Sequence, residues 1–150
     1  MAKPKPVNEL KCIFPSWSQN EALARSVAAS FTAQMNPTCE EVSDIKCAVS
    51  EAVTNAIVHG YRGTVGEIQM ILKLYADRTF QAEVRDRGVG IRDVEEAMRP
   101  LFTTDPENER SGMGFTIIEN FMDSLRVLSE PGKGTRVIMK KKLSMLPIAK

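Results

Sequence analysis

Residues 68–86 read IQMILKLYADRTFQAEVRD, and this stretch decides the class of fold. Apolar residues take every second position on both sides of a tight connection at residues 76–78, which predicts two strands paired as a hairpin. Counting by two from Val84 places Asp86 on the side of the core residues, where the second strand ends. A carboxylate that points toward a core needs a polar partner, so Asp86 is a first candidate for a functional residue.

The remaining sequence alternates between strand and helix patterns. Period-two runs predict strands at residues 10–14, 125–129 and 135–142. Apolar residues at helical spacing predict helices at residues 18–35, 40–57, 93–98 and 112–123. Gly60 is expected to end the second helix, and Ser18 with Glu21 has the form of a capping box at the start of the first. Residues 99–111 hold no apolar period, which predicts a mobile loop.

The order strand, helix, helix, strand, strand, helix, helix, strand, strand predicts a two-layer α/β (α+β) sandwich. In such a fold a mixed, mostly antiparallel sheet carries its helices on one face. A chain of 150 residues has the size of one domain and can bury a core of its own. Residues 1–150 are therefore expected to form a single domain.

Composition excludes several classes of protein. Hydrophobic residues make up 43% of the chain and charged residues 26%, values typical of a soluble globular protein. With 20 Lys and Arg against 19 Asp and Glu, the net charge is +1, which lacks the basic field of a nucleic-acid-binding protein. No run approaches the roughly 18 apolar residues of a membrane span, and the first residues lack the apolar core of a signal peptide. We expect a cytoplasmic protein whose partners are neither nucleic acid nor membrane.

Cysteine and histidine are too few for two further kinds of site. Cys12, Cys39 and Cys47 form no CxxC pair, and His59 is the one histidine in the chain. A disulfide framework and a zinc site of His and Cys ligands are therefore not expected.

Three polar residues share one face of the second predicted helix. Glu51, Asn55 and His59 stand at positions i, i+4 and i+8. A solvated helix face has the same spacing, so the pattern alone leaves both interpretations open. In the functional interpretation the Asn55 amide oxygen binds Mg²⁺, which prefers oxygen ligands, and Glu51 accepts a proton.

A glycine-containing segment follows the second strand of the hairpin, where residues 86–91 read DRGVGI. An inward aspartate can accept a hydrogen bond from an exocyclic amine such as that of adenine, and glycines let the backbone approach a flat ring. An ordinary glycine loop would have the same sequence, so that interpretation also stays open.

Two more glycine pairs occur toward the C-terminus. Residues 111–115 (SGMGF) open a predicted helix, and helix N-termini bind phosphate through their free N–H groups, although a flexible joint would have the same sequence. Residues 131–135 (PGKGT) lack the first glycine of a P-loop and predict a hairpin turn. Thr135 enters the last strand and could hydrogen-bond a ligand near Asp86, although threonine also favours strands without any functional role.

Taken in order, these segments resemble the N, G1, G2 and G3 boxes of the GHKL ATPase superfamily. The matching residues are 51–55 (EAVTN) with His59, 86–90 (DRGVG), 112–114 (GMG) and 134–135 (GT). The resemblance implies the Bergerat ATP-binding fold.

Longer segments resemble one family within this superfamily, the sporulation anti-sigma F factors, which are serine kinases. The similar segments are SEAVTNA at 50–56, HGY at 59–61, PLFTT at 100–104 and ERSGMGFT at 109–116. The resemblance implies a homodimer that sequesters a sporulation sigma factor. It also implies that the protein uses ATP and Mg²⁺ to phosphorylate a serine of an anti-anti-sigma antagonist protein, with ADP as the other product.

The same resemblance implies roles for individual residues. Glu51 would be the base that takes the serine proton, Asn55 the Mg²⁺ ligand and Asp86 the residue that recognises adenine. A lid over the phosphates would run from Thr103 to Gly114. The nucleotide-binding residues would also include His59, Gly88, Gly90, Ile91, Thr103, Thr104, Arg110, Ser111, Gly112, Met113, Gly114, Phe115 and Thr135.

Partner contacts are implied for three residues. Glu21 and Arg25 would lie on the sigma-binding surface of the homodimer, while Arg110 would neutralise γ-phosphate charge or touch the antagonist. Glu21 and Arg25 are also a common i, i+4 helix pair, so a purely structural role stays open.

Three other functions stay open beside the sporulation kinase. Anti-sigma kinases of stress-response sigma factors share this architecture, and a nucleotide-gated module could hold a sigma factor without catalysis. A catalytic fragment of a histidine kinase is disfavoured, because no histidine other than His59 could accept phosphate in cis.

Overall fold

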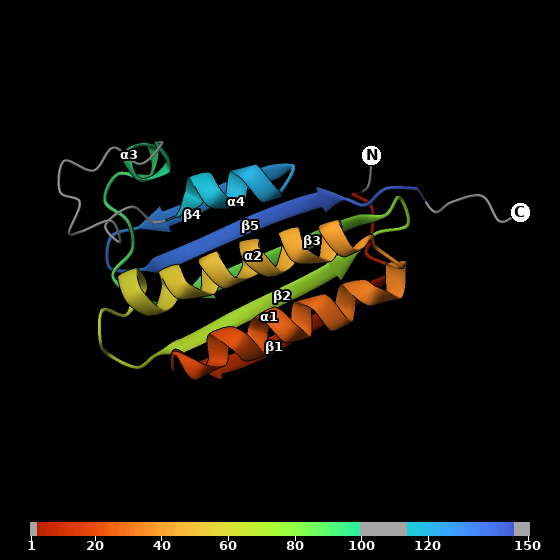
Figure 1. Ribbon diagram of the computed structural model, residues 1–150. Coiled ribbons are helices and arrows are strands. Elements are labelled where there is room, and N and C mark those ends of the chain that lie inside the picture. The colour runs from red at the N-terminus through yellow and green to blue at the C-terminus, as the bar shows by residue number, and fades with distance from the viewer. Residues whose placement is uncertain (1–2, 100–113, 146–150) are drawn as a thin grey trace, which may run out of the picture.

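A five-stranded antiparallel sheet forms one layer of the computed structural model, which describes residues 3–99 and 114–145 (Figure 1). Its strands follow the order β1 (Asn8–Pro15), β2 (Glu67–Leu74), β3 (Thr79–Asp86), β5 (Gly134–Lys142) and β4 (Ser124–Glu130). All four neighbouring pairs are antiparallel. The sheet is therefore purely antiparallel, whereas a mixed, mostly antiparallel sheet was expected. The hairpins β2–β3 and β4–β5 produce this order, because each chain reversal pairs its two strands directly.

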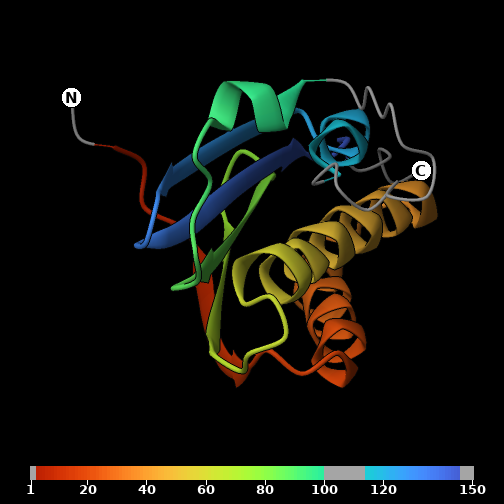
Figure 2. The ribbon, with the colours of Figure 1, turned by 90° about the vertical axis from the view of Figure 1, so that its left-hand side faces the viewer.

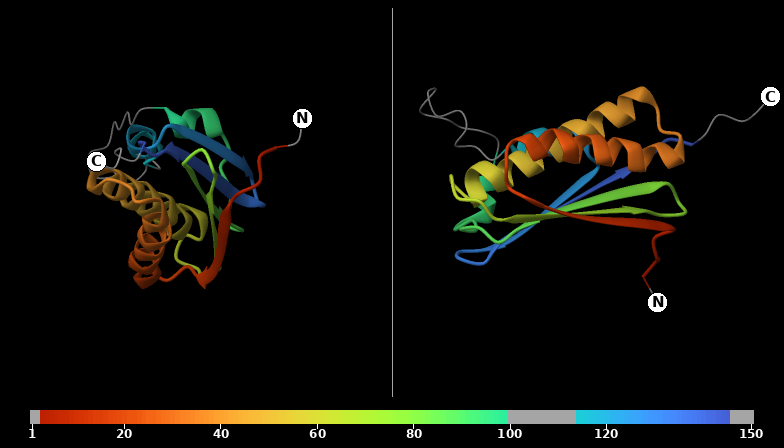
Figure 3. Two further views of the ribbon diagram at one scale, coloured as in Figure 1. Left: turned by 90° about the vertical axis from the view of Figure 1, so that its right-hand side faces the viewer. Right: turned by 90° about the horizontal axis from the view of Figure 1, so that it is seen from below.

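Helices on one face of the sheet form the second layer, as the two-layer sandwich predicts (Figures 2 and 3). These helices are α1 (Gln19–Thr32), α2 (Cys39–Asn55) and α4 (Phe115–Phe121), with short segments η1 (Ala33–Met35) and η2 (Ala56–Gly60) continuing α1 and α2. The short helix α3 (Val94–Met98) follows β3 and contacts α4 and β4. None of the helices within the described residues is long and apolar enough to cross a bilayer.

The core lies between the two layers and follows the alternation of the hairpin. Ile68, Met70 and Leu72 of β2 are fully buried and belong to the same hydrophobic cluster as Ile45 and Val49 of the helical layer. Burial of a side chain of this size contributes about 1.5–3 kcal/mol. Asp86 continues the inward series of β3 and pairs across the sheet with Ile68 on β2 and Thr135 on β5, as the count by two predicts.

The second predicted helix changes its hydrogen-bonding pattern before it ends. Its α-helical part stops at Asn55, and residues 56–60 continue as a π-helix. The N–H of Tyr61 donates to the carbonyl of Ala56 at 3.0 Å, five residues earlier, which is the π-helical spacing. Gly60 ends the helix, as expected.

The capping box expected at Ser18 and Glu21 is wrong. Ser18 makes no side-chain cap bond, because its backbone is helical (φ −58°, ψ −31°) whereas a capping serine needs an extended conformation. The capping box lies at the start of α2. There Thr38 is extended (φ −70°, ψ 161°), its Oγ1 accepts from the N–H of Glu41 at 3.1 Å, and Glu41 Oε1 accepts from the N–H of Thr38 at 2.8 Å.

We expect Thr38→Ala to lower the free energy of unfolding by about 1 kcal/mol, because the variant loses the acceptor for the N–H of Glu41. Urea denaturation followed by circular dichroism measures this loss. Ser18→Ala is the matched control, since Ser18 stands before α1 without a cap bond and should change stability by less than about 0.5 kcal/mol. Equal losses in the two variants would contradict this assignment of the caps.

Candidate functional site

A cavity lies between the end of α2 and the ends of β3 and β5. It is lined from α2, η2, β3, the segment after β3, α4 and β5. The lining residues are Ala52, Asn55, Ala56, His59, Gly60, Val84, Asp86, Gly90, Ile91, Phe115, Thr135 and Val137. Seven of these were candidates from the sequence alone, namely Asn55, His59, Asp86, Gly90, Ile91, Phe115 and Thr135. The fold therefore brings together residues that stand up to 80 positions apart in the chain.

Asp86 supplies the acidic group of this cavity. The residue is 9% exposed, and its Oδ1 accepts from the N–H of Gly88 at 2.9 Å. Burial raises the pKa of the Asp86 carboxyl, against the lowering by backbone hydrogen bonds from Gly88 and Thr135. A Cβ built at Gly60 would lie 3.0 Å from this carboxyl, so the end of η2 packs closely over it.

Gly88 and Gly90 are required by contacts within the protein itself. A Cβ at Gly88 would lie 2.0 Å from the carbonyl oxygen of Gly60, and one at Gly90 would lie 2.1 Å from that of Glu130. Gly90 also has φ +74°, which a side chain rarely tolerates. The backbone approach inferred from these glycines is thus made toward η2 and the β4–β5 turn.

Two side chains outside the predicted set fix the segment after β3. The Tyr61 hydroxyl accepts from the N–H of Arg87 at 2.8 Å and donates to the carbonyl of Glu67. Ser129 Oγ accepts from the N–H of Ile91 at 2.8 Å and lies 2.8 Å from Thr135 Oγ1. Ser129 continues the inward alternation of β4 from Val127, and this polar residue at an inward position is the signal that could have found it.

Glu51 lies in a separate groove between α1, α2 and α4. The groove is lined by Arg25, Ser50 and Glu51 together with the apolar side chains Ile117 and Phe121 of α4. Burial, and then the negative charge of Glu21, raise the pKa of the Glu51 carboxyl. The predicted stripe is therefore divided, because Asn55 and His59 line the cavity while Glu51 lines the groove.

The Glu51 carboxylate lies against the start of α4. A Cβ built at Gly114 would come within 2.5 Å of Glu51 Oε2, and Gly114 has φ +66°. Glycine at this position leaves room for the carboxylate. Phe115, the next residue, is buried and lines the cavity that holds Asp86, not the groove of Glu51.

Six candidates lie outside the described residues: Thr103, Thr104, Arg110, Ser111, Gly112 and Met113. The expected loop at 99–111 falls there too, apart from Arg99. Within residues 3–99 and 114–145, no group of three or more His, Cys, Asp or Glu side chains is arranged to hold a metal ion. Asn55, the candidate Mg²⁺ ligand, lies within the described residues, is 9% exposed and lines the cavity.

Comparison with known sequences identifies the family. A model of the histidine kinase-like ATPase domain matches residues 14–141. The anti-sigma F factor of Clostridium acetobutylicum is 50% identical over 139 residues, which cover 93% of this chain and 96% of the relative. That of Geobacillus stearothermophilus is 54% identical over 134 residues, covering 89% and 92%. The chain belongs to the anti-sigma F factor family.

Solved structures show the same fold at low sequence identity. This anti-sigma F family chain superposes on the RsbU and RsbW domains of a Mycobacterium tuberculosis protein with a TM-score of 0.69 and 23% identity, covering 94% of this chain and 34% of that one. It superposes on the histidine kinase domain of a blue-light activated kinase from Erythrobacter litoralis with a TM-score of 0.57 and 19% identity, covering 82% and 61%. The predicted GHKL-type ATP-binding fold is confirmed, and it is the fold of a nucleotide-binding ATPase domain.

The raised pKa of Asp86 predicts that ionisation of this carboxyl lowers the free energy of unfolding. A carboxyl with a raised folded-state pKa contributes stability below its ordinary pKa of 3.8, and that contribution is lost as pH rises through the folded-state value. Asp86→Asn cannot ionise, so the stability of the variant should rise relative to wild type as the pH increases above about 4. Urea denaturation across this range measures the difference.

Asp77→Asn is the control with the opposite sign. Hydrogen bonds from Thr79 hold the pKa of the exposed Asp77 carboxyl below its usual range, so its contribution is present above pH 3.8 and lost on acidification. This variant should lose stability relative to wild type toward neutral pH. Parallel pH profiles of wild type and Asp86→Asn would contradict the assigned burial cost.

Proposed function

We propose that residues 1–150 act as one kinase domain that binds and inhibits a sporulation sigma factor and phosphorylates a serine of an anti-anti-sigma antagonist. The names of its relatives support the anti-sigma role. The observation that carries the enzymatic part is the pairing of two sites on α2. A cavity with a buried carboxyl at Asp86 lies on one side of the helix, and a groove that holds Glu51 lies on the other.

The cavity has the residues expected around the adenine end of ATP, but its volume is about 20 Å³, room for about one water molecule, so it would have to open to admit the ring. Asp86 would accept a hydrogen bond from the exocyclic amine, and guanine, which has a carbonyl at that position, would be rejected. Ile91 and Phe115 provide apolar walls for the ring. The lid would be formed by residues 103–114, with Arg110 neutralising γ-phosphate charge.

Asn55 fits the role of Mg²⁺ ligand. It offers an amide oxygen at the cavity, and Mg²⁺ commonly takes one or two protein oxygens and completes its shell with phosphate and water. The ion would supply charge neutralisation on the phosphates. Asn55 then determines where the phosphates lie relative to Glu51, one helical turn before it.

Glu51 would serve as the general base. Its raised pKa makes it a better proton acceptor than an exposed glutamate, because basicity grows with the pKa of the conjugate acid. In the proposed transfer the acceptor serine enters the groove, Glu51 takes the hydroxyl proton, and the oxygen attacks the γ-phosphorus as the bond to ADP breaks. Positioning and charge neutralisation provide most of the acceleration in such reactions.

Glu51→Gln should keep ATP binding and sigma-factor binding but lower the rate of antagonist phosphorylation by about 100-fold or more, since the amide cannot take a proton. The measurement is transfer of label from γ-labelled ATP, with Mg²⁺, to the antagonist serine. Glu40→Gln, at an exposed glutamate of the first turn of α2, is the control and should transfer at the wild-type rate.

The outcomes of this assay separate the candidate functions. Transfer by Glu51→Gln at the wild-type rate would remove Glu51 from the base role. No transfer by wild type that still binds ATP would favour a nucleotide-gated module that holds the sigma factor without catalysis. Transfer to the antagonist of a stress-response system instead would favour a stress-response kinase of the same architecture.

Asp86→Asn should weaken ATP binding by about 1.5–3 kcal/mol, the value of one hydrogen bond to a charged group. Isothermal titration calorimetry with ATP measures this loss of affinity, and the same titration with GTP measures the rejection of guanine. Asp77→Asn is the control, because Asp77 lies in the β2–β3 turn and should leave ATP affinity unchanged. Wild-type affinity in Asp86→Asn would discard the adenine-recognition role.

A further inference from the structure

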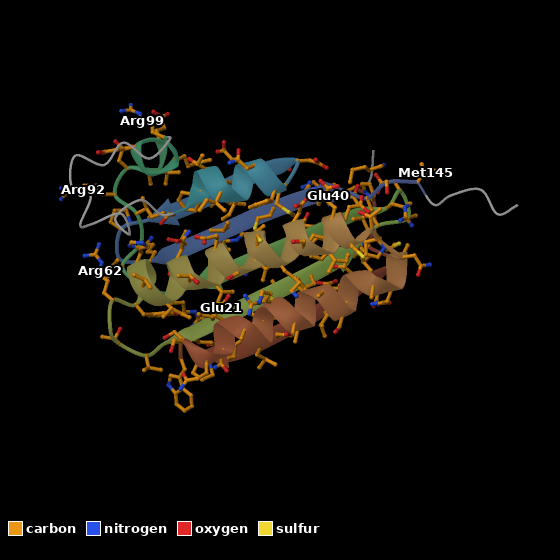
Figure 4. The ribbon with its side chains drawn as sticks, viewed as in Figure 1. Glu21, Glu40, Arg62, Arg92, Arg99 and Met145 are labelled. Carbon is orange, nitrogen blue, oxygen red and sulfur yellow. The ribbon has the colours of Figure 1, made fainter. Side chains whose placement is uncertain are left out.

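Glu21 connects α1 to the part of α2 that holds the proposed base. Its Oε1 accepts a hydrogen bond from Ser50 Oγ, although the two residues stand 29 positions apart. The same oxygen lies 3.7 Å from Arg25 Nη1. Figure 4 shows Glu21 between α1 and α2. The carboxylate is thus held from both helices and is more than a member of an i, i+4 pair on one of them.

The Ser50 bond places a negative charge beside the groove of Glu51. Ser50 directly precedes Glu51, and both line the groove with Arg25. The Glu21 side chain is 22% exposed, so its charge is only partly screened by water, and it acts on Glu51. Two carboxylates in such surroundings repel each other.

The opposite wall of the groove has room for the Glu51 carboxylate. Glu51 Oε2 lies against Gly114 at the start of α4, where any side chain at position 114 would collide with it. Repulsion from Glu21 on the α1 side and the space left by Gly114 on the α4 side favour the same orientation of Glu51. That orientation points away from α1.

We propose that Glu21 is a positioning residue for phosphoryl transfer, held by Ser50 and Arg25 so that it keeps the Glu51 carboxylate turned toward α4. This inference rests on the proposed kinase function and on Glu51 as its base. Under it, the Ser50 hydroxyl serves the chemical step without touching the acceptor. A group that only stabilised the helices would affect folding and leave the rate of transfer per folded molecule unchanged.

Ser50→Ala tests the proposal, because it removes the hydroxyl that holds Glu21 and leaves Glu21, Arg25 and Glu51 in place. We expect kcat for antagonist phosphorylation to fall about 10-fold, as misplacement of a reacting group by a fraction of an ångström costs this much. The KM for the antagonist and the Kd for ATP should stay within about twofold of wild type. Ser50→Thr restores a hydroxyl and should recover most of kcat.

Two further variants separate charge from packing. Glu21→Gln keeps an acceptor for Ser50 but lacks the charge, so its kcat should also fall, whatever its effect on sigma-factor binding. Ser30→Ala removes an exposed serine of α1 that lies outside the groove lining, and it should retain wild-type kcat and KM. Thermal unfolding of each variant provides the folded fraction used to normalise kcat.

The outcomes distinguish this inference from the proposed function. Wild-type kcat in Ser50→Ala, or a loss that Ser50→Thr does not recover, would overturn the positioning role while the kinase function stands. A loss confined to KM would assign Ser50 and Glu21 to partner binding instead. Absence of transfer by the wild-type protein would overturn the kinase function and this inference together.

Discussion

The buried carboxyl group of Asp86 is the constraint on which the rest of the cavity depends. Burial of such a group is costly unless hydrogen bonds compensate it, and the N–H of Gly88 provides one of them. To surround this carboxyl, the backbones of η2, β3 and β5 come so close that a Cβ at Gly60 or Gly88 would meet the carboxyl or a carbonyl oxygen. One short segment after β3 is held in place by these close glycine contacts and by the hydroxyls of Tyr61 and Ser129.

Helix α2 lines two different spaces because its two sides face different neighbours. One side meets the sheet, the segment after β3 and Phe115, and there Asn55 lines a cavity with apolar walls. The other side meets α1 and α4, and there Glu51 lines a groove with Arg25 and Ser50. In the proposed function, nucleotide binding and transfer to a protein would therefore use residues four positions apart, and their ligands would approach from different directions.

Individual residues show which features local sequence patterns predict and which they do not. The alternation at 68–86 predicted both strands, their pairing and the inward direction of Asp86, because side-chain direction in a strand has a fixed period of two. The Ser18 capping pattern failed, because a cap depends on the backbone dihedral angles of one residue, and Glu21 bonds to Ser50 of another helix instead. Neither the π-helical end of α2 nor the contact of Glu51 with Gly114 has a local pattern that would reveal it.

The sequence by itself determined the order and type of the elements, the two-layer antiparallel class, and the chemical kinds of residue that the candidate sites use. Those properties follow from periodicity, glycine spacing and composition, which act over a few neighbouring residues. Only the tertiary structure decided that Asn55 and Glu51 open into different spaces, that Ser129 and Tyr61 hold the segment after β3, and that Ser50 holds Glu21. These contacts join residues 26 to 38 positions apart, so they exist only after the two layers have packed together.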